Sequence, residues 1–275
     1  MNNAPVFFIS HGAPTFALEP GQLGPRLAAI GEHLSGATAI LVVSPHWQTR
    51  NVSVMTTPKP GTVHDFGGFD PALYKLQYPV AGQPELAAEA ARLLDEAGFA
   101  VDIDARRGLD HGAWVPLMHL RPGADVPVFQ VSLPAALDTA GAVRLGRALA
   151  PLRKRGVVIV GSGSLTHNLY EFRQSASDVA PYAREFAAWT RDVVTQGDVE
   201  RLVDYRRLAP HAERAHPTEE HFLPLLVAMG AQAAGEKAQL IEGGITYGVL
   251  AMDSYVWGLD ETQAASPASE AGAVA

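Results

Sequence analysis

The chain has 275 residues, of which 47% are hydrophobic and 18% are charged, and its formal net charge is -8. This composition predicts a folded protein with a substantial core, and a negative chain without any block of Lys or Arg is a poor partner for nucleic acid or anionic membranes. The N-terminal sequence lacks the basic n-region and the long apolar run of a secretion signal or membrane span, so we expect a cytoplasmic protein with a small-molecule partner.

Short apolar runs rich in β-branched residues recur along the chain, and several are apolar at consecutive positions, as in strands buried on both faces. Amphipathic segments that end near a glycine lie between them and predict helices. This alternation predicts an α/β fold with a layered, mostly parallel or mixed central sheet flanked by helices. The expected strands cover 6–10, 39–44, 52–56, 126–133 and 156–162, with later ones in 238–243 and 247–255, and the expected helices cover 84–99, 140–156 and 180–198.

The domain organisation follows from the absence of any internal repeat or break in composition. We therefore expect one domain over residues 1–258. Residues 259–275 are a low-complexity run of small residues that cannot form a core, and we expect this tail to be disordered.

The chain contains no cysteine and ten histidines. Without thiolates there can be no disulfide, no iron–sulfur cluster and no cysteine-ligated metal, so a metal would have to be held by His, Asp, Glu or water. The histidines are therefore the first candidates for chemistry.

Three histidines follow the carboxyl ends of expected buried strands: His11, His46 and His167. Ligands of open α/β sheets bind at that edge, so these side chains are expected to converge although they are far apart in sequence. "SHGAP" and "SPHW" place His11 and His46 in Gly/Pro turns, and "LDHGAW" places His111 in a further turn ahead of a helix-like segment.

The remaining histidines have simpler interpretations. We expect His119 to be a hydrogen-bonded core residue, because it lies in an apolar helical stretch, and we expect His33 and His211 to lie at the surface. The loop that contains His64, "TVHDFGGFDPALY", is compatible either with a cover over a substrate or with an ordinary turn.

The segment "HPTEEHFLPLL" (216–226) offers a further ligand, His221. If Thr218 caps a helix, His221 lies on its first turn; if Pro224 begins the helix, His221 lies in the turn that enters it. The neighbouring Glu219 and Glu220 could also ligate, although acidic residues are common in a first helical turn because they interact favourably with the helix dipole.

Two competing motifs fail on their spacing. "VVIVGSGSLTH" begins like a dinucleotide-binding turn, but the third glycine of that pattern would fall at position 166, which is Thr. The same segment has glycine where the nucleophile of a serine-hydrolase turn should stand, and the chain contains no phosphate-binding P-loop pattern.

A cluster of neutral imidazoles suits zinc, iron, copper or nickel. Three protein ligands would leave coordination positions open, as in catalytic sites, and His111 and His167 could then transfer protons because imidazole titrates near neutral pH. Zinc-dependent hydrolysis and iron-dependent oxygen chemistry fit these residues equally well.

The motifs, taken together and in order, resemble the DOPA 4,5-dioxygenase type of extradiol ring-cleavage dioxygenase within the class III (LigB-like) superfamily. The resemblance extends from about Val6 to Trp257. It is carried by the segments "FISHGAPTFALEPG", "LVVSPHW", "HDFGGFDPALYKLQYPVAG", "LDHGAWVPLMHLRP", "GSGSLTHNL", "HPTEEHFLPLLVAMGA" and "YGVLAMDSYVW". One departure is Asp70, which stands before the proline of "GFDP" where the family has none.

The resemblance implies metal ligation by His11, His46 and His221, a catalytic role for His167, and a second active-site histidine in His111. It implies cleavage of a substituted, DOPA-like catechol by O2 to a muconic semialdehyde, with Fe(II) expected for activity and Zn(II) plausible as the bound metal. We take His167 as the main acid/base group and His111 as a hydrogen-bonding partner of dioxygen or substrate. The alternative is a zinc-dependent hydrolase, or a non-catalytic metal-binding protein, on the same fold.

Overall fold

The computed structural model describes residues 3–172 and 178–259, so the predicted tail lies, beyond Leu259, outside the described residues. The strands are β1 (Val6–Ser10), β2 (Ala39–Thr49), β3 (Val52–Met55), β4 (Val101–Asp104), β5 (Val128–Pro134), β6 (Val157–Gly163), β7 (Gln239–Ile241), β8 (Ile245–Thr246), β9 (Leu250–Ala251) and β10 (Ser254–Trp257).

The α-helices are α1 (Leu23–Gly31), α2 (Pro84–Glu96), α3 (His111–Leu120), α4 (Thr139–Leu149), α5 (Pro181–Gln196), α6 (Val199–Val203), α7 (Tyr205–Leu208), α8 (Ala212–Ala215) and α9 (Leu223–Ala231). Short 3₁₀ helices cover Pro14–Ala17, Glu32–Leu34, Leu73–Lys75 and Ala150–Arg155.

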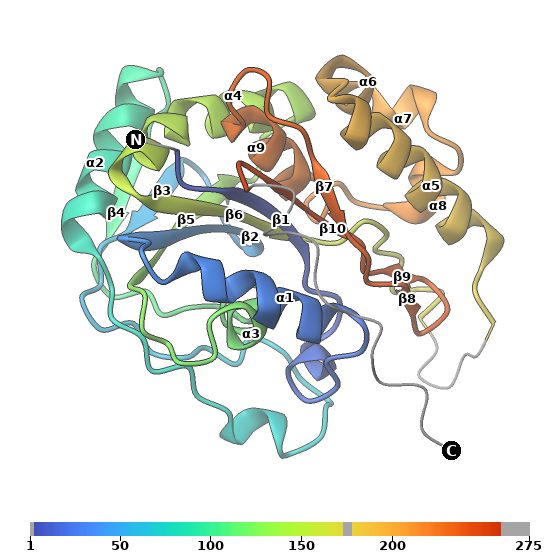
Figure 1. Ribbon diagram of the computed structural model, residues 1–275, viewed down its shortest axis with the longest axis horizontal. Coiled ribbons are helices and arrows are strands. Elements are labelled where there is room, and N and C mark those ends of the chain that lie inside the picture. Colours follow the sequence, from blue (N-terminus) through green and yellow to red (C-terminus); the bar gives the residue numbers. More distant parts are fainter. Residues whose placement is uncertain (1–2, 173–177, 260–275) are drawn as a thin grey trace.

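Within the described ranges, an eight-stranded sheet with the order β4-β3-β5-β2-β6-β1-β10-β7 forms the centre of the molecule (Figure 1). Strands β5, β2, β6 and β1 are mutually parallel neighbours, whereas β10 and β7 extend the sheet in antiparallel pairs. The four parallel strands are buried along nearly their whole length, as their continuous apolar runs predict.

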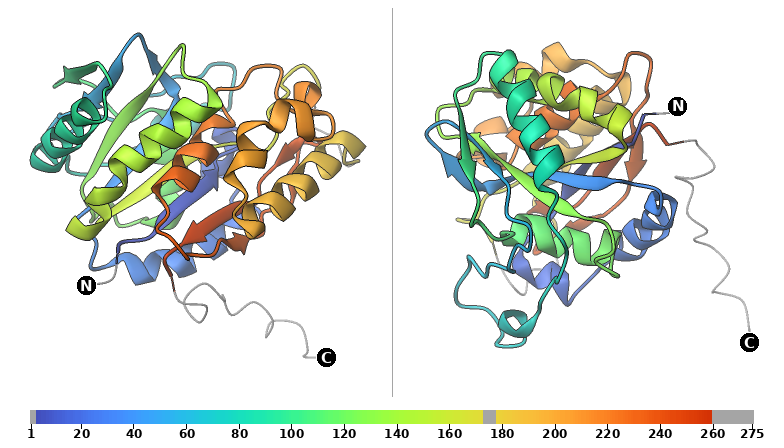
Figure 2. Two further views of the ribbon diagram at one scale, coloured as in Figure 1. Left: turned by 90° about the horizontal axis from the view of Figure 1, so that it is seen from above. Right: turned by 90° about the vertical axis from the view of Figure 1, so that its left-hand side faces the viewer.

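Helices cover both faces of this sheet. Helices α1 and α3 lie on one face, and α2, α4 and α9 lie on the other (Figures 1 and 2). Every residue of α9 is buried, because this helix lies between the sheet and α4. The predicted α/β fold with a mostly parallel, mixed sheet flanked by helices is thus confirmed.

The parallel strands all end at one edge of the sheet, and the topology therefore decides where the histidines meet. β1 and β2 both pair with β6 in parallel register, so the segments after them emerge side by side. No helix in 3–172 or 178–259 has the length and apolar character needed to cross a membrane.

Candidate metal centre and active site

His11 directly follows β1, and its backbone N–H continues the β1–β6 ladder by donating to the carbonyl of Gly163 at 2.9 Å. The side chain is 1% exposed, and its Nδ1 lies 2.9 Å from the Ser162 hydroxyl. That hydroxyl donates its hydrogen to the carbonyl of Gly112, so it must accept from His11. Nδ1 therefore carries the ring hydrogen, and Nε2 presents a lone pair.

The structure places His46 inside β2 and not in a turn after it, which corrects the sequence prediction. The register between β2 and β5 shifts between Val43 and Gln48, so the intervening residues bulge out of the ladder. Pro45 has no N–H to donate, and the N–H of His46 bonds to the Ser44 hydroxyl at 3.2 Å. The bulge re-aims His46 toward the end of β1.

His221 lies in the turn that enters α9, as the second of the two alternatives expected, although the helix begins at Leu223, one residue before Pro224. Its carbonyl accepts from the N–H of Ser164 at 2.9 Å. The glycines of the G-S-G motif allow this approach, because a Cβ on Gly161 would lie 2.1 Å from the Pro224 carbonyl and one on Gly163 would lie 2.4 Å from that of His221. Close backbone packing accounts for a motif that had suggested nucleotide binding.

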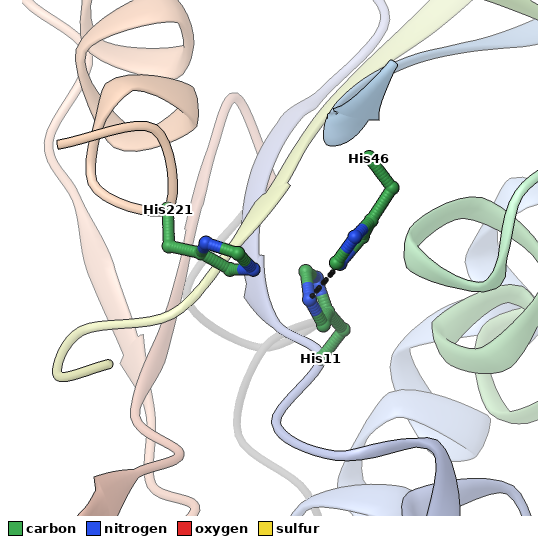
Figure 3. A group of neighbouring side chains, drawn as sticks. All are labelled: His11, His46 and His221. Atoms are coloured by element: carbon green, nitrogen blue, oxygen red, sulfur yellow. Dashed lines mark hydrogen bonds between the residues drawn. The ribbon is translucent and has the colours of Figure 1, made fainter. Parts of the chain in front are cut away.

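The ring nitrogens of His11, His46 and His221 lie within 4.8 Å of one another (Figure 3). The Nε2 atoms of His11 and His46 are 3.1 Å apart, and two nitrogens bound to one tetrahedral metal ion at about 2.0–2.1 Å lie about 3.3 Å apart. His221 Nδ1 lies 3.1 Å from the Glu220 carboxylate, which can only accept, so its Nε2 also presents a lone pair.

The positions and free lone pairs of these three imidazole nitrogens fit a bound metal ion. His221 Nε2 is buried and has no hydrogen-bond partner among the described residues, and a buried nitrogen lone pair without a partner is costly. His11 and His221 each donate the other ring N–H to an oxygen, the arrangement that orients metal-binding imidazoles.

The electrostatics agree with this fit. Burial holds the pKa of His11 and of His221 well below the usual range, and neighbouring imidazoles lower both further. Burial lowers the pKa of His46 to about 3, with a further contribution from His111. The three rings are therefore neutral at pH 7, as metal ligation requires.

Two overlapping groups also bring possible ligands together: His46 with Asp65 and His111, and His167 with Glu220 and His221. In each of these groups a histidine already donates to the carboxylate of the same group. We therefore assign the metal to the group in which three imidazole nitrogens converge.

His111 is the first residue of α3, where a turn had been predicted. Asp110 caps this helix, because its carboxylate accepts from the N–H of Ala113 at 3.2 Å. Asp65 approaches from the other side, and its Oδ1 accepts from both the backbone N–H (2.9 Å) and Nδ1 (3.0 Å) of His111. Burial raises the pKa of Asp65, but the hydrogen bonds from His111 outweigh it and lower this pKa to about 2.

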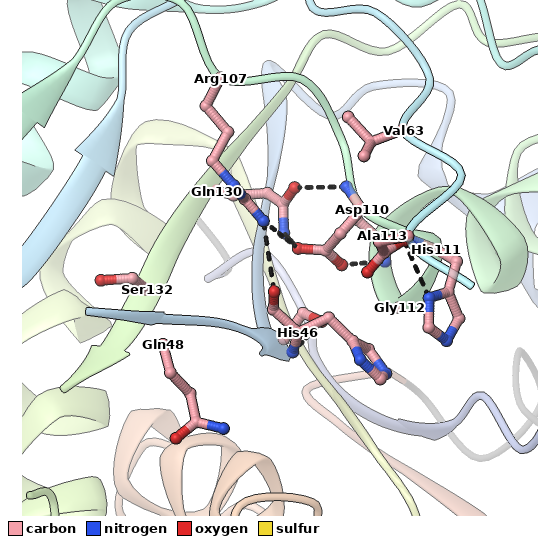
Figure 4. A network of polar contacts seen from close by, with 12 residues as sticks. His46, Gln48, Val63, Arg107, Asp110, His111, Gly112, Ala113, Gln130 and Ser132 are labelled. Carbon is pink, nitrogen blue, oxygen red and sulfur yellow. Dashed lines mark hydrogen bonds and ion pairs between the residues drawn. The ribbon is translucent and has the colours of Figure 1, made fainter. Parts of the chain in front are cut away.

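A buried polar network joins α3 to the strand that carries His46 (Figure 4). The Asp110 carboxylate accepts from Gln130 at 2.9 Å and from Arg107 at 3.2 Å. Arg107 also donates to the carbonyl of His46 at 3.4 Å and stacks over Trp47. One network thus holds the backbone of His46 and the start of the helix that carries His111.

His167 lies in the loop after β6, and its N–H donates to the carbonyl of Ala215 at 2.8 Å. Its ring stacks on that of His221, and burial lowers its pKa to about 4. His167 is therefore neutral at pH 7 and can accept a proton.

Four histidines of the cluster, His46, His111, His167 and His221, line a cavity of about 360 Å³. The rest of the lining is apolar and includes three phenylalanines, as in typical sites for small molecules. The cavity is lined by Gly12, Ala13, Pro14, His46, Phe66, Phe69, His111, His167, Leu169, Phe172, His221 and Leu250. Asp70, the departure from the family pattern, is exposed and accepts from the N–H of Ala72 at 2.7 Å, while its neighbour Phe69 still reaches the cavity.

The other histidines lie outside the cluster. His119 donates through Nε2 to the carbonyl of Phe16 at 2.7 Å, so its ring is hydrogen-bonded as expected, but the residue is half-buried and not part of the core; His33 is exposed as predicted. His211 pairs with Glu185 at 2.9 Å at the surface. His64 bonds the carbonyl of Leu76 at 3.0 Å, which assigns it to holding its loop.

The two histidines of segment 216–226 thus have different roles. His216 is fully buried and donates to the carbonyl of Leu165 at 2.8 Å, while His221 enters the cluster. Sequence inspection missed Asp65 and Ser162, which both touch predicted site histidines. Asp65 directly follows His64, the residue of this loop that the sequence had singled out. Ser162 lies within the "GSGS" motif, in which only the glycine positions had been considered.

The chain matches known proteins over most of its length. Residues 6–256 match the family described as the catalytic LigB subunit of aromatic ring-opening dioxygenase. A 4,5-DOPA dioxygenase extradiol of Beta vulgaris is 42% identical, over 91% of this chain and 95% of that protein, and one of Escherichia coli K12 is 37% identical, over 90% and 92%.

A solved structure supports the same assignment. The crystal structure of an uncharacterized protein from Escherichia coli K12 superposes with a TM-score of 0.78 at 32% identity, covering 92% of this chain and 99% of that one. The resemblance inferred from the motifs is confirmed. The chain therefore belongs to the LigB family of aromatic ring-opening dioxygenases and is an enzyme of the extradiol ring-cleaving class.

Proposed function

We propose that this enzyme cleaves the ring of a substituted, DOPA-like catechol with O2 to give a muconic semialdehyde. The observation that carries the proposal is the convergence of three neutral imidazole nitrogens beside a largely apolar cavity of about 360 Å³, which His111 and His167 also line. The DOPA-like substrate is supported by several relatives, which are 4,5-DOPA dioxygenases of the extradiol type.

His11, His46 and His221 would hold the metal, and residues 1–258 would form one catalytic domain. Ferrous iron at this position would supply the electron transfer that dioxygen needs before it reacts with an aromatic ring. Zn(II) is a plausible bound metal because the same donor set suits it. The expected partners are a catechol and O2, and the expected location is the cytoplasm.

The protein's own groups would bind the ring and manage its protons. Phe66, Phe69 and Phe172 offer aromatic faces against which a planar catechol can pack. His167, neutral at pH 7, would take a phenolic proton as general base and return it as general acid. His111, fixed by Asp65, would hydrogen-bond one of the two reactants, substrate or dioxygen.

Oxygen consumption tests this proposal. Metal-free protein is reconstituted anaerobically with Fe(II) or with Zn(II) and then mixed with O2 and DOPA or other catechols, while absorbance follows the yellow ring-opened product. We expect oxygen uptake and colour with Fe(II) only. His46→Ala should abolish both, whereas His33→Ala, an exposed histidine outside the cluster, should match the wild type.

One result would overturn the proposal: stoichiometric binding of Fe(II) with no oxygen uptake on any catechol. That outcome would move the assignment to a zinc-dependent hydrolase or a non-catalytic metal-binding protein.

A further inference from the structure

We infer that Asp65 is a positioning residue that fixes which ring nitrogen of His111 faces the cavity, and that His111 therefore accepts a hydrogen bond from a substrate hydroxyl. The first half concerns the structure alone. The second half rests on the proposed function, since it assumes a catechol in the cavity.

The hydrogen-bond pattern of Asp65 is directed at one residue. Its Oδ1 accepts from the backbone N–H and from Nδ1 of His111, at 2.9 and 3.0 Å, and these are its only hydrogen bonds among the described residues. A carboxylate can only accept, so His111 Nδ1 must carry the hydrogen of this pair. Asp65 thereby sets both the rotation of the ring and the position of its hydrogen.

The loop around Asp65 is itself held against the segment before α3, so the carboxylate is fixed in place. The N–H of Val63 donates to the carbonyl of Leu109 at 2.8 Å, and the indole N–H of Trp114 donates to the carbonyl of Val63 at 2.9 Å. A Cβ on Gly108 would lie 2.4 Å from the carbonyl of Gly61, which shows how closely the two segments approach.

With the hydrogen on Nδ1, the nitrogen of His111 that remains available to a ligand is Nε2. In a neutral imidazole whose Nδ1 carries the hydrogen, Nε2 is an acceptor and has nothing to donate. His111 lines the cavity, and its ring lies 3.9 Å from that of His46 and 5.7 Å from that of His11, measured between centroids. A phenolic O–H can donate to such a nitrogen, whereas dioxygen cannot. The structure thus favours substrate over dioxygen as the partner of His111.

Three variants separate positioning from folding. Asp65→Asn keeps an Oδ1 that can accept both hydrogen bonds, and Asp65→Ala removes them. Asp70→Ala is the matched control, because Asp70 belongs to the same loop and also accepts a backbone N–H but contacts no histidine ring in any hydrogen bond.

The first measurement is the tautomer of His111 in Zn(II)-loaded protein labelled with ¹⁵N-histidine, read from long-range ¹H–¹⁵N correlations and assigned with His111→Gln. We expect the Nδ1–H tautomer in the wild type, in Asp65→Asn and in Asp70→Ala. In Asp65→Ala we expect the Nε2–H tautomer or a mixture. An Nδ1–H tautomer retained in Asp65→Ala, or a wild-type ring that is not in this tautomer, would overturn the inference.

The second measurement is turnover of Fe(II)-loaded protein with a catechol. We expect kcat to fall about tenfold to a hundredfold in Asp65→Ala, as for other residues that orient a site histidine, with partial recovery in Asp65→Asn and unchanged metal stoichiometry. Equal kcat in Asp65→Ala and wild type would refute the role in the reaction. If no variant turns over any catechol, the proposed function fails, while the tautomer still decides what Asp65 does.

Discussion

The rings of His167 and His221 are stacked, with 3.4 Å between their centroids and 9° between their planes. One ring comes from the loop after β6 and the other from the turn before α9, and the Ser164 N–H joins the two segments through the carbonyl of His221. The candidate acid/base group is therefore placed by the same contacts that place a candidate ligand.

His167→Ala should separate chemistry from metal binding. We expect kcat to fall by about 10²–10⁴, the usual contribution of a general acid/base group, while the metal stoichiometry stays that of the wild type. Oxygen uptake and metal analysis on one preparation measure both quantities. His211→Ala, at the surface, is the control; loss of the metal together with activity in His167→Ala would instead assign His167 to the metal.

Ser162→Ala should weaken metal binding without touching a ligand. The hydroxyl accepts from His11 Nδ1, and its removal leaves a buried N–H unpaired and the ring free to change tautomer. Losses of about tenfold to a hundredfold in metal affinity are typical for such partners. Chelator competition with Zn(II) measures the change. Ser132→Ala, also buried but bonded to Thr49 and Ser53, should leave the affinity unchanged.

Gly112→Ala tests how closely α3 packs against β2. A Cβ there would lie 2.3 Å from the Ser44 hydroxyl oxygen and 2.9 Å from Cδ2 of His46, so His46 must move. We expect a loss of both metal affinity and turnover, and about 1–3 kcal/mol of stability from overpacking. Gly36→Ala, where a new Cβ would meet nothing within 4 Å, is the matched control and should behave as the wild type.

The metal-free protein should lose stability as the pH falls from about 7 to 5. The pKa is lowered to about 3 in His46 and about 4 in His167, so the unfolded chain takes up protons first, near its ordinary pKa of about 6.5. The stability that these groups contribute is complete above that pH and is lost below it, by up to about 1.4 kcal/mol per pH unit for each histidine.

Urea unfolding at pH 7.5, 6 and 5 measures this slope. His46→Gln should show a shallower slope because one such group is missing, and the exposed His33→Gln should match the wild type. Constant stability of the wild type over this range would contradict the buried, neutral histidine cluster.

The local sequence carried enough information for the architecture and for the expectation that histidines following different strands converge. Strands β1, β2, β5 and β6 are buried on both faces, so their apolar runs are continuous and identify a parallel sheet without any knowledge of contacts. Once the sheet is parallel, segments that follow different strands meet at one edge, and His11 and His167 could be brought together in prediction.

Tertiary structure alone decided the features that depend on pairing between distant residues. The bulge that aims His46 arises from the register between β2 and β5, which the residues around Pro45 do not encode locally. Asp65 meets His111, and Ser162 meets His11, across 46 and 151 positions of sequence. Hydrophobic periodicity reports which face of an element is buried, whereas the hydrogen-bond partner of a buried ring depends on which loop the completed fold places beside it.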